Sequence, residues 1–224
     1  HAIAKIDKAF SYMKEKPVPE YTFAPEDAIT SPVIKEVVGP DAESVTIAFR
    51  LPSNQDKDAA LANLVGSILT NGKAGLIDLN LVKKQKLLKA SAYSYLLVDH
   101  GLLYISASPS QGQSLEDVKK LLLNEIENLK KGNFDDDLIP SIVNNIKKHK
   151  IQQTESYGDR AYMLMDAFTG KLNWRDQVAY VNDLSKVTKK DIMDFANKYF
   201  GNNYVAVLKY KGERTDIEKI EKPT

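Results

Sequence analysis

Apolar residues recur at helical spacing through much of the chain. In residues 58–70, an apolar residue falls at i, i+3, i+4, i+7 and i+8, which forms one continuous stripe. The same periodicity, bounded by capping residues, glycines and prolines, predicts further helices. These helices cover residues 2–14, 76–88, 114–132, a segment that begins near residue 139 with Pro140 in its first turn, 156–168, 174–184 and 188–201.

Alternation of apolar and polar residues, together with β-prone composition, predicts the strands. Residues 29–51 contain two β-branched runs on either side of Gly39 and Pro40, which predicts a strand pair or two nearby strands. Residues 90–110 predict a hairpin that turns at residues 99–101, and residues 203–213 predict a final strand. Because the hairpin and the helices come in blocks, we expect an α+β fold: an antiparallel or mixed sheet packed on one face by several helices.

Gly66, Gly72 and Lys73 raise the question of a phosphate-binding loop. A Walker-type loop needs four residues between its first glycine and the Gly-Lys pair, followed by Ser or Thr. Here five residues intervene, Ala74 follows Lys73, and Gly66 lies within the apolar stripe. We therefore interpret Asn71 and Gly72 as the end of a buried helix, where a residue in the left-handed region is common.

The composition narrows the class of protein. With 224 residues, 43% of them hydrophobic, the chain can bury a core. Its formal net charge of +1 gives no general electrostatic attraction to nucleic acid, and we therefore expect no nucleic-acid partner. The chain has no cysteine for a disulfide or a thiolate zinc site, and no apolar run approaches the ~20 residues of a membrane span. Because it begins with His1 and has no signal-peptide core, we expect it to be part of a longer polypeptide.

Candidate catalytic and metal-binding residues are few. A helical zinc pair needs two histidines one turn apart, whereas His1, His100 and His149 are widely separated in the sequence. No Gly-x-Ser-x-Gly motif occurs, which leaves open only a triad of distant residues. The acidic run 135–137 lacks the spacing of a calcium loop, and it is better explained as a helix N-terminus. Lysines within 83–89 and 147–150 form two basic patches that we interpret as solvated helix ends.

Several segments together resemble a domain of the insulinase or pitrilysin type of zinc metallopeptidase, the M16 family. The resemblance rests on LPSNQDKDAALANLVGSILTNGKAGLI, on the hairpin LLKASAYSYLLVDHGLLYISAS, on LEDVKKLLLNEIENLKKGNFDDD, and on AFTGKLNW with the following helix and strand. It covers about residues 29–213, nearly the whole chain.

The resemblance implies a non-catalytic domain, the second domain of a longer zinc protease. In this family, paired α+β domains close around an unstructured peptide, and one domain carries a helical His-x-x-Glu-His that binds zinc and activates water. The corresponding helix here, residues 58–70, contains neither His nor Glu. Some partner domains present an Arg and a Tyr to the substrate, but Val82 and Lys89 stand at those places. We expect no catalytic, cofactor-binding or metal-binding residue in this chain.

The resemblance also implies the domain organisation. Residues 1–28 are expected to be a short helix and linker from a preceding domain, residues 29–213 an inactive M16-like domain, and residues 214–224 a linker tail. The chain is then no enzyme on its own, but part of a zinc metalloendopeptidase whose zinc lies in a sibling domain.

The expected function is to form part of the substrate-enclosing chamber and to help bind unstructured peptides that the sibling M16 catalytic domain cleaves. The alternative is a purely structural scaffold subunit of a multi-protein complex, without peptide binding. An independent hydrolase with unrecognised residues is a third interpretation. The resemblance favours an exported, periplasmic location, although this sequence contains no targeting signal.

Overall fold

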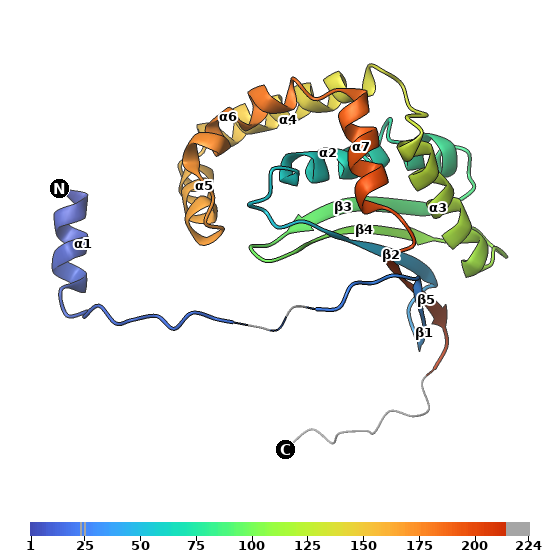
Figure 1. The fold of residues 1–224 in the computed structure, drawn as a ribbon, viewed down its shortest axis with the longest axis horizontal. Coiled ribbons are helices and arrows are strands. Elements are labelled where there is room, and N and C mark those ends of the chain that lie inside the picture. The colour runs from blue at the N-terminus through green and yellow to red at the C-terminus, as the bar shows by residue number, and fades with distance from the viewer. Residues whose placement is uncertain (23, 25, 214–224) are drawn as a thin grey trace.

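The computed structural model describes residues 1–22, 24 and 26–213, so the expected tail at 214–224 lies outside the described residues (Figure 1). Its centre is a five-stranded mixed sheet in the order β1-β5-β2-β4-β3. The strands are β1 (Val33–Gly39), β2 (Ser44–Leu51), β3 (Lys89–Leu96), β4 (Gly101–Ser108) and β5 (Tyr204–Lys211). With its helices, this sheet confirms the predicted α+β class.

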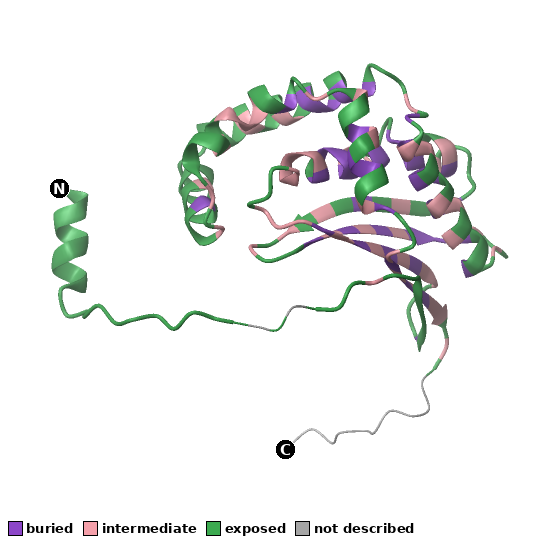
Figure 2. Ribbon diagram, in the orientation of Figure 1, coloured by how far each residue is buried: buried purple, intermediate pink, exposed green. Residues whose placement is uncertain are grey.

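The core lies between one face of the sheet and the helices. Along β2 and β4, buried residues alternate with half-buried ones, as the period of two in a strand requires. Val45, Ile47 and Phe49 on β2 point into the core and are at most 1% exposed. Helices α2 (Ala59–Leu69), α3 (Leu115–Lys130) and α7 (Lys189–Tyr199) cover this face, while no helix of the described residues covers the opposite face (Figures 1 and 2).

The two strands predicted within residues 29–51 both form, but they do not pair with each other. Strand β5 lies between them, parallel to β1 and antiparallel to β2. Strand β5 takes the second position of the sheet, between the edge strand β1 and the central strand β2, and buried residues alternate with half-buried ones over most of its length. Local sequence cannot reveal this arrangement, because the partner lies more than 150 residues away along the chain in the register Val45 to Leu208.

The prediction of a helix over residues 76–88 is wrong in length, because the helical segment is much shorter. The chain forms a short π-helix, η1 (Asp78–Val82), in which the amide of Lys83 donates to the carbonyl of Asp78, five residues back. A tight turn follows, with Gln85 at a φ of 55°. Because the turn must lead directly into β3, the backbone cannot continue as a helix beyond Lys83.

The other predicted helices form close to their expected positions. Helix α7 begins with a complete capping box between Thr188 and Asp191, and α3 begins with Ser114 accepting a hydrogen bond from the amide of Asp117. Three more helices, α4 (Leu138–Glu155), α5 (Tyr157–Thr169) and α6 (Trp174–Leu184), form an arch that extends beyond α2 (Figure 1). Among the residues described, none of the helices is both long and apolar enough to cross a membrane.

The N-terminal helix α1 (Ala2–Phe10) stands apart from the sheet, at the end of an extended segment (Figure 1). None of its residues is buried. Its apolar stripe is therefore exposed, with Ile3 at 74%, Ile6 at 56% and Phe10 at 53% exposure. A helix of nine residues has little stability alone, and the described part of the chain does not cover this stripe.

Candidate functional site

Helix α2 occupies the position where the family resemblance placed the zinc-binding helix. Its apolar stripe is buried against the sheet, and Asn63 is its most solvent-accessible polar residue within the helix. Asn63 and Ser67 engage each other, since the Ser67 hydroxyl donates to the Asn63 carbonyl at 3.4 Å. Amide and hydroxyl groups without an imidazole or a carboxylate do not fit zinc, which requires His, Cys, Asp or Glu ligands. Within the described residues, no group of three or more such side chains converges.

The loop after α2 is closed by its own side chains. The Oδ1 atom of Asn71 accepts from the amides of Lys73 and Ala74 at 3.1 and 2.9 Å. The Oδ2 atom of buried Asp78 accepts from the amides of Asn71 and Gly75 at 2.8 and 3.2 Å. A phosphate-binding loop must present such amides to its ligand. Here carboxylate and amide oxygens already occupy them, which supports the rejection of a phosphate site.

The residues at the places of the missing Arg and Tyr lie on different elements. Val82 ends η1 and packs partly buried against the core, whereas Lys89 is the exposed first residue of β3, opposite Ser108. The neighbouring η1 is tied to α3, because Asn80 donates to the buried carboxylate of Glu125 at 2.8 Å.

The histidines and the acidic run that the sequence offered as metal-site candidates lie in a turn, on a helix surface and at a helix start. His100 lies in the β3–β4 turn, and His149 is exposed on α4. In the acidic run, Asp137 precedes α4 and donates its amide to Asp135 at 2.8 Å, while Asp136 pairs with Lys189 at 2.6 Å. The run therefore organises the beginning of a helix, and its side chains are spread along the turn.

Asp58, just before α2, connects this helix to α7. Its Oδ2 atom accepts from the Lys198 ammonium at 2.7 Å and from the Tyr199 hydroxyl at 3.0 Å. Burial acts to raise the pKa of Asp58, but the two hydrogen bonds and the charge of Lys198 outweigh it and lower the pKa below the usual 3.8. In return, the hydrogen bond to Asp58 raises the pKa of Lys198.

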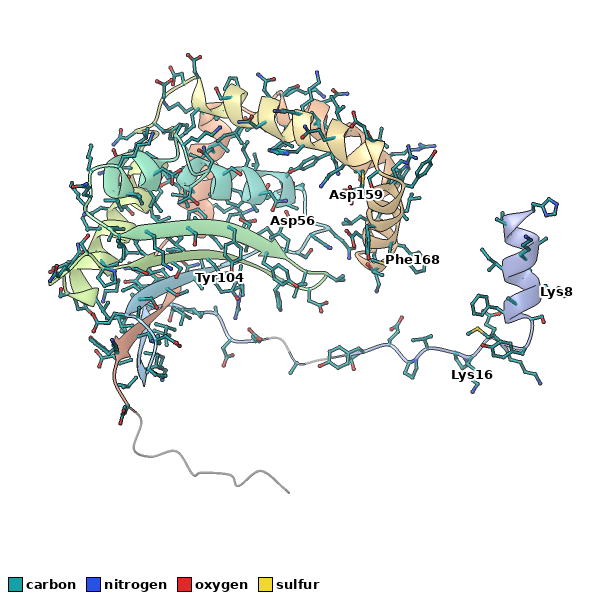
Figure 3. The ribbon with its side chains drawn as sticks, turned by 180° about the vertical axis from the view of Figure 1, so that it is seen from behind. Lys8, Lys16, Asp56, Tyr104, Asp159 and Phe168 are labelled. Atoms are coloured by element: carbon teal, nitrogen blue, oxygen red, sulfur yellow. The ribbon has the colours of Figure 1, made fainter. Side chains whose placement is uncertain are left out.

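A large cleft opens beside the first turn of α2. Its volume is about 1140 Å³, and it lies between the loop before α2, the end of the β3–β4 hairpin, and the α5–α6 turn. Figure 3 labels Asp56 on the α2 side, facing α5 across this space. Asn54 joins the two sides, because its Nδ2 atom donates to the carbonyl of Gly170 at 3.3 Å. Its Oδ1 atom is buried and has no hydrogen-bond partner.

Sequence reasoning did not find this cleft. Its lining comes from residues 54–63, 95–98, 150 and 166–183, and no short motif links these segments. The available signal was weak: in helix 156–168, Asp159 and Asp166 lie on one face, and Tyr157 and Phe168 lie on the opposite face. From the sequence alone, the polar face would be assigned to solvent.

The sheet face without helices carries aromatic side chains. Tyr93 on β3 and Tyr104 on β4 are direct cross-strand partners, with ring centroids 5.4 Å apart. Tyr93 and Tyr95 are each more than half exposed. This face and the α1 stripe both leave apolar side chains of the described residues open to solvent, which is typical of a protein that contacts a partner.

Comparison with known proteins identifies related chains. The family model for the peptidase M16 inactive domain matches residues 1–146. A zinc protease PqqE of Helicobacter pylori is 24% identical over 188 residues, which cover 78% of this chain and 42% of that protein. This chain therefore spans less than half the length of that relative.

Solved structures share the fold. A protease from Helicobacter pylori superposes with a TM-score of 0.85 and 21% identity, covering 93% of this chain and 52% of that one. The peptidase M16 inactive domain from Pseudomonas fluorescens gives a TM-score of 0.72 at 15% identity, covering 88% and 47%. Because the family model matches more than half of the residues, this chain belongs to the peptidase M16 family and carries its inactive domain.

Proposed function

We propose that this chain is a non-catalytic wall of an M16 peptidase chamber, which helps to bind unstructured peptides while a sibling domain with zinc cleaves them. The observation that carries this proposal is the composition of α2: the helix is fully formed at the expected position, yet its exposed polar groups are amide and hydroxyl groups. A domain that keeps the fold without metal ligands can still shape a substrate-binding surface.

A sibling domain would cover the apolar surfaces that the chain leaves open. The stripe of α1 and the aromatic sheet face both need a partner, and the chain spans only about half the length of its relatives. This supports residues 1–28 as a connection to a preceding domain, and residues 29–213 as the inactive domain itself. Zinc would then reside in the sibling domain.

Strand addition at the sheet edge would capture an extended peptide, and the two edges differ. At β3, the Thr70 hydroxyl accepts from the Ala92 amide at 2.7 Å and donates to the Ala92 carbonyl at 3.1 Å, which occupies that edge. At β1, every residue except Gly39 is exposed. We therefore assign peptide capture by strand addition to β1, whose backbone groups face outward on one side.

The test starts with the 224-residue chain alone. We expect elemental analysis to find no stoichiometric zinc, and a quenched unstructured peptide to remain uncleaved. Adding a sibling domain with His-x-x-Glu-His should then produce cleavage that a chelator abolishes. One zinc per chain with chelator-sensitive cleavage by the isolated chain would contradict the proposal, and so would a sibling domain whose cleavage is independent of this chain.

The scaffold alternative is favoured by one observation, the outward apolar stripe of α5. Tyr157 and Phe168 are 86% and 84% exposed, and Leu164 lies between them on the same face. A scaffold subunit would use such a surface to hold a partner and would show no affinity for unstructured peptide. Peptide binding by the isolated chain therefore distinguishes the two functions.

A further inference from the structure

We propose that the cleft between α2 and the α5–α6 turn is a binding site for an extended, hydrophilic peptide segment. This inference rests on the proposed function and adds a second peptide-binding site in this chain, separate from the edge strand β1. It is carried by the size of the cleft, by the orientation of α5, and by the chemistry of the lining.

The size of the cleft suits a stretch of polymer. Pockets for small molecules are typically about 300–1,000 Å³ and mostly apolar. This cleft has a volume of about 1140 Å³, and amides, hydroxyls and charged groups from four separate segments line it. A large groove with both polar and apolar lining groups matches a peptide chain, which has hydrogen-bonding groups and side chains of both kinds, better than a compact apolar ligand.

Helix α5 is oriented with its polar side toward the cleft. Asp166, Thr169 and Gly170 line the cleft, whereas Tyr157 and Phe168 lie on the outer side and are almost fully exposed. Figure 3 labels Phe168 near the lower end of α5. A surface helix usually turns its apolar stripe to the protein. The reversed orientation disfavours closure of the cleft, because closure would bury the Asp166 carboxylate, which forms no ion pair among the described residues.

The charged residues of the lining do not neutralise one another. Lys57, Lys150, Lys171, Asp166 and Asp176 line the cleft, and none of these five belongs to an ion pair found among the described residues. Asp183 of the lining does form an ion pair, but its partner Lys186 lies outside the lining. A lining with both signs of charge complements a peptide that carries both acidic and basic side chains.

The lining also offers groups for the peptide main chain. Gln177 supplies an amide donor and acceptor, as alternating N–H and C=O groups of an extended chain require. The Nδ2 group of Asn173 adds a donor, because only its Oδ1 atom is engaged, by the Arg175 amide at 2.9 Å. The buried Oδ1 atom of Asn54 adds an acceptor without a partner, which a ligand N–H can satisfy when the amide reorients. At the hairpin end, half-exposed Leu97 provides contact for an apolar side chain.

The experiment measures binding of fluorescein-labelled β-casein, an unstructured polypeptide, to the full 224-residue chain by fluorescence anisotropy. Ala59→Trp places an indole in the cleft at the half-buried first residue of α2, and it should weaken binding at least about tenfold. The matched control Ala161→Trp adds the same side chain to an exposed position of α5 outside the lining, and it should leave the affinity within about twofold.

A charge variant keeps the test independent of side-chain size. Asp166→Lys reverses a lining charge near the C-terminal end of α5, where a cation favours the helix dipole, and we expect an altered affinity for casein. Glu155→Lys, at the exposed end of α4, is the matched control and should bind as the wild type does. Circular dichroism confirms that each variant is folded.

The outcomes separate this inference from the proposed function. If the wild-type chain binds no casein, peptide binding by this domain is wrong. If the wild type binds but Ala59→Trp and Asp166→Lys bind equally well, the cleft is not the site, while the proposed function stands. If Ala59→Trp instead weakens only the association with the sibling domain, the cleft is an interface between domains and the inference is overturned.

Discussion

The carboxylate of Asp58 should stabilise the fold by linking α2 to α7, and Asp58→Ala tests this link. Its side chain is only 16% exposed and accepts a hydrogen bond from the part-buried Tyr199 hydroxyl at 3.0 Å. Hydrogen bonds to a charged group contribute about 1.5–3 kcal/mol. We assign no share to Lys198, because its side chain is largely exposed and solvent screens the pair. The expected loss in the free energy of unfolding is therefore about 2 kcal/mol.

The assay is urea denaturation followed by circular dichroism, in a double-mutant cycle with Tyr199→Phe. Because both substitutions remove the same hydrogen bond, their effects should not add, and the coupling energy should be about 1–2 kcal/mol. Asp194→Ala, which removes the partner of fully exposed Lys190, is the control and should leave the stability essentially unchanged. Additive effects of Asp58→Ala and Tyr199→Phe would refute this account.

The same link predicts a pH dependence. Since the pKa of Asp58 in the folded chain lies below 3.8, the unfolded state binds the proton more readily. The stabilisation is therefore fully present above the ordinary pKa, and it is lost as the pH falls through the lower pKa of the folded state. The difference in the free energy of unfolding between wild type and Asp58→Asn should therefore become smaller as the pH falls below 3.8. A difference that stays constant with pH would contradict the lowered pKa of Asp58.

Two further predictions concern the sheet edge and α1. Thr70→Val should lower the free energy of unfolding by about 1–3 kcal/mol, because the Ala92 amide and carbonyl lose their hydrogen-bond partner. Thr70→Ser keeps the hydroxyl and should therefore retain most of the wild-type stability. Faster hydrogen exchange at the Ala92 amide in Thr70→Val would locate the effect, and unchanged exchange would contradict it. Deleting residues 1–13 should leave the unfolding free energy within about 0.5 kcal/mol, because no residue of α1 is buried; a larger loss would show that α1 packs on the domain.

The local elements of this chain follow from its sequence. The stripe that begins at Leu61 produces α2, the pair Thr188 and Asp191 produces the capping box of α7, and Gly101 follows the hairpin turn. These signals operate within one or two turns of backbone, so periodicity and capping chemistry suffice to detect them. The family resemblance and the absence of zinc ligands in α2 could also be recognised at this level.

The tertiary structure decided the features that depend on distant residues. Only the fold inserts β5 between β1 and β2, shortens the helix predicted for residues 76–88 to η1, and brings Asp58 to Tyr199 across 141 positions. The cleft has the same origin, since its lining assembles from segments with no common motif. The physical reason is that strand pairing, arch placement and side-chain contacts reflect the free energy of the whole packed chain, which local periodicity does not encode.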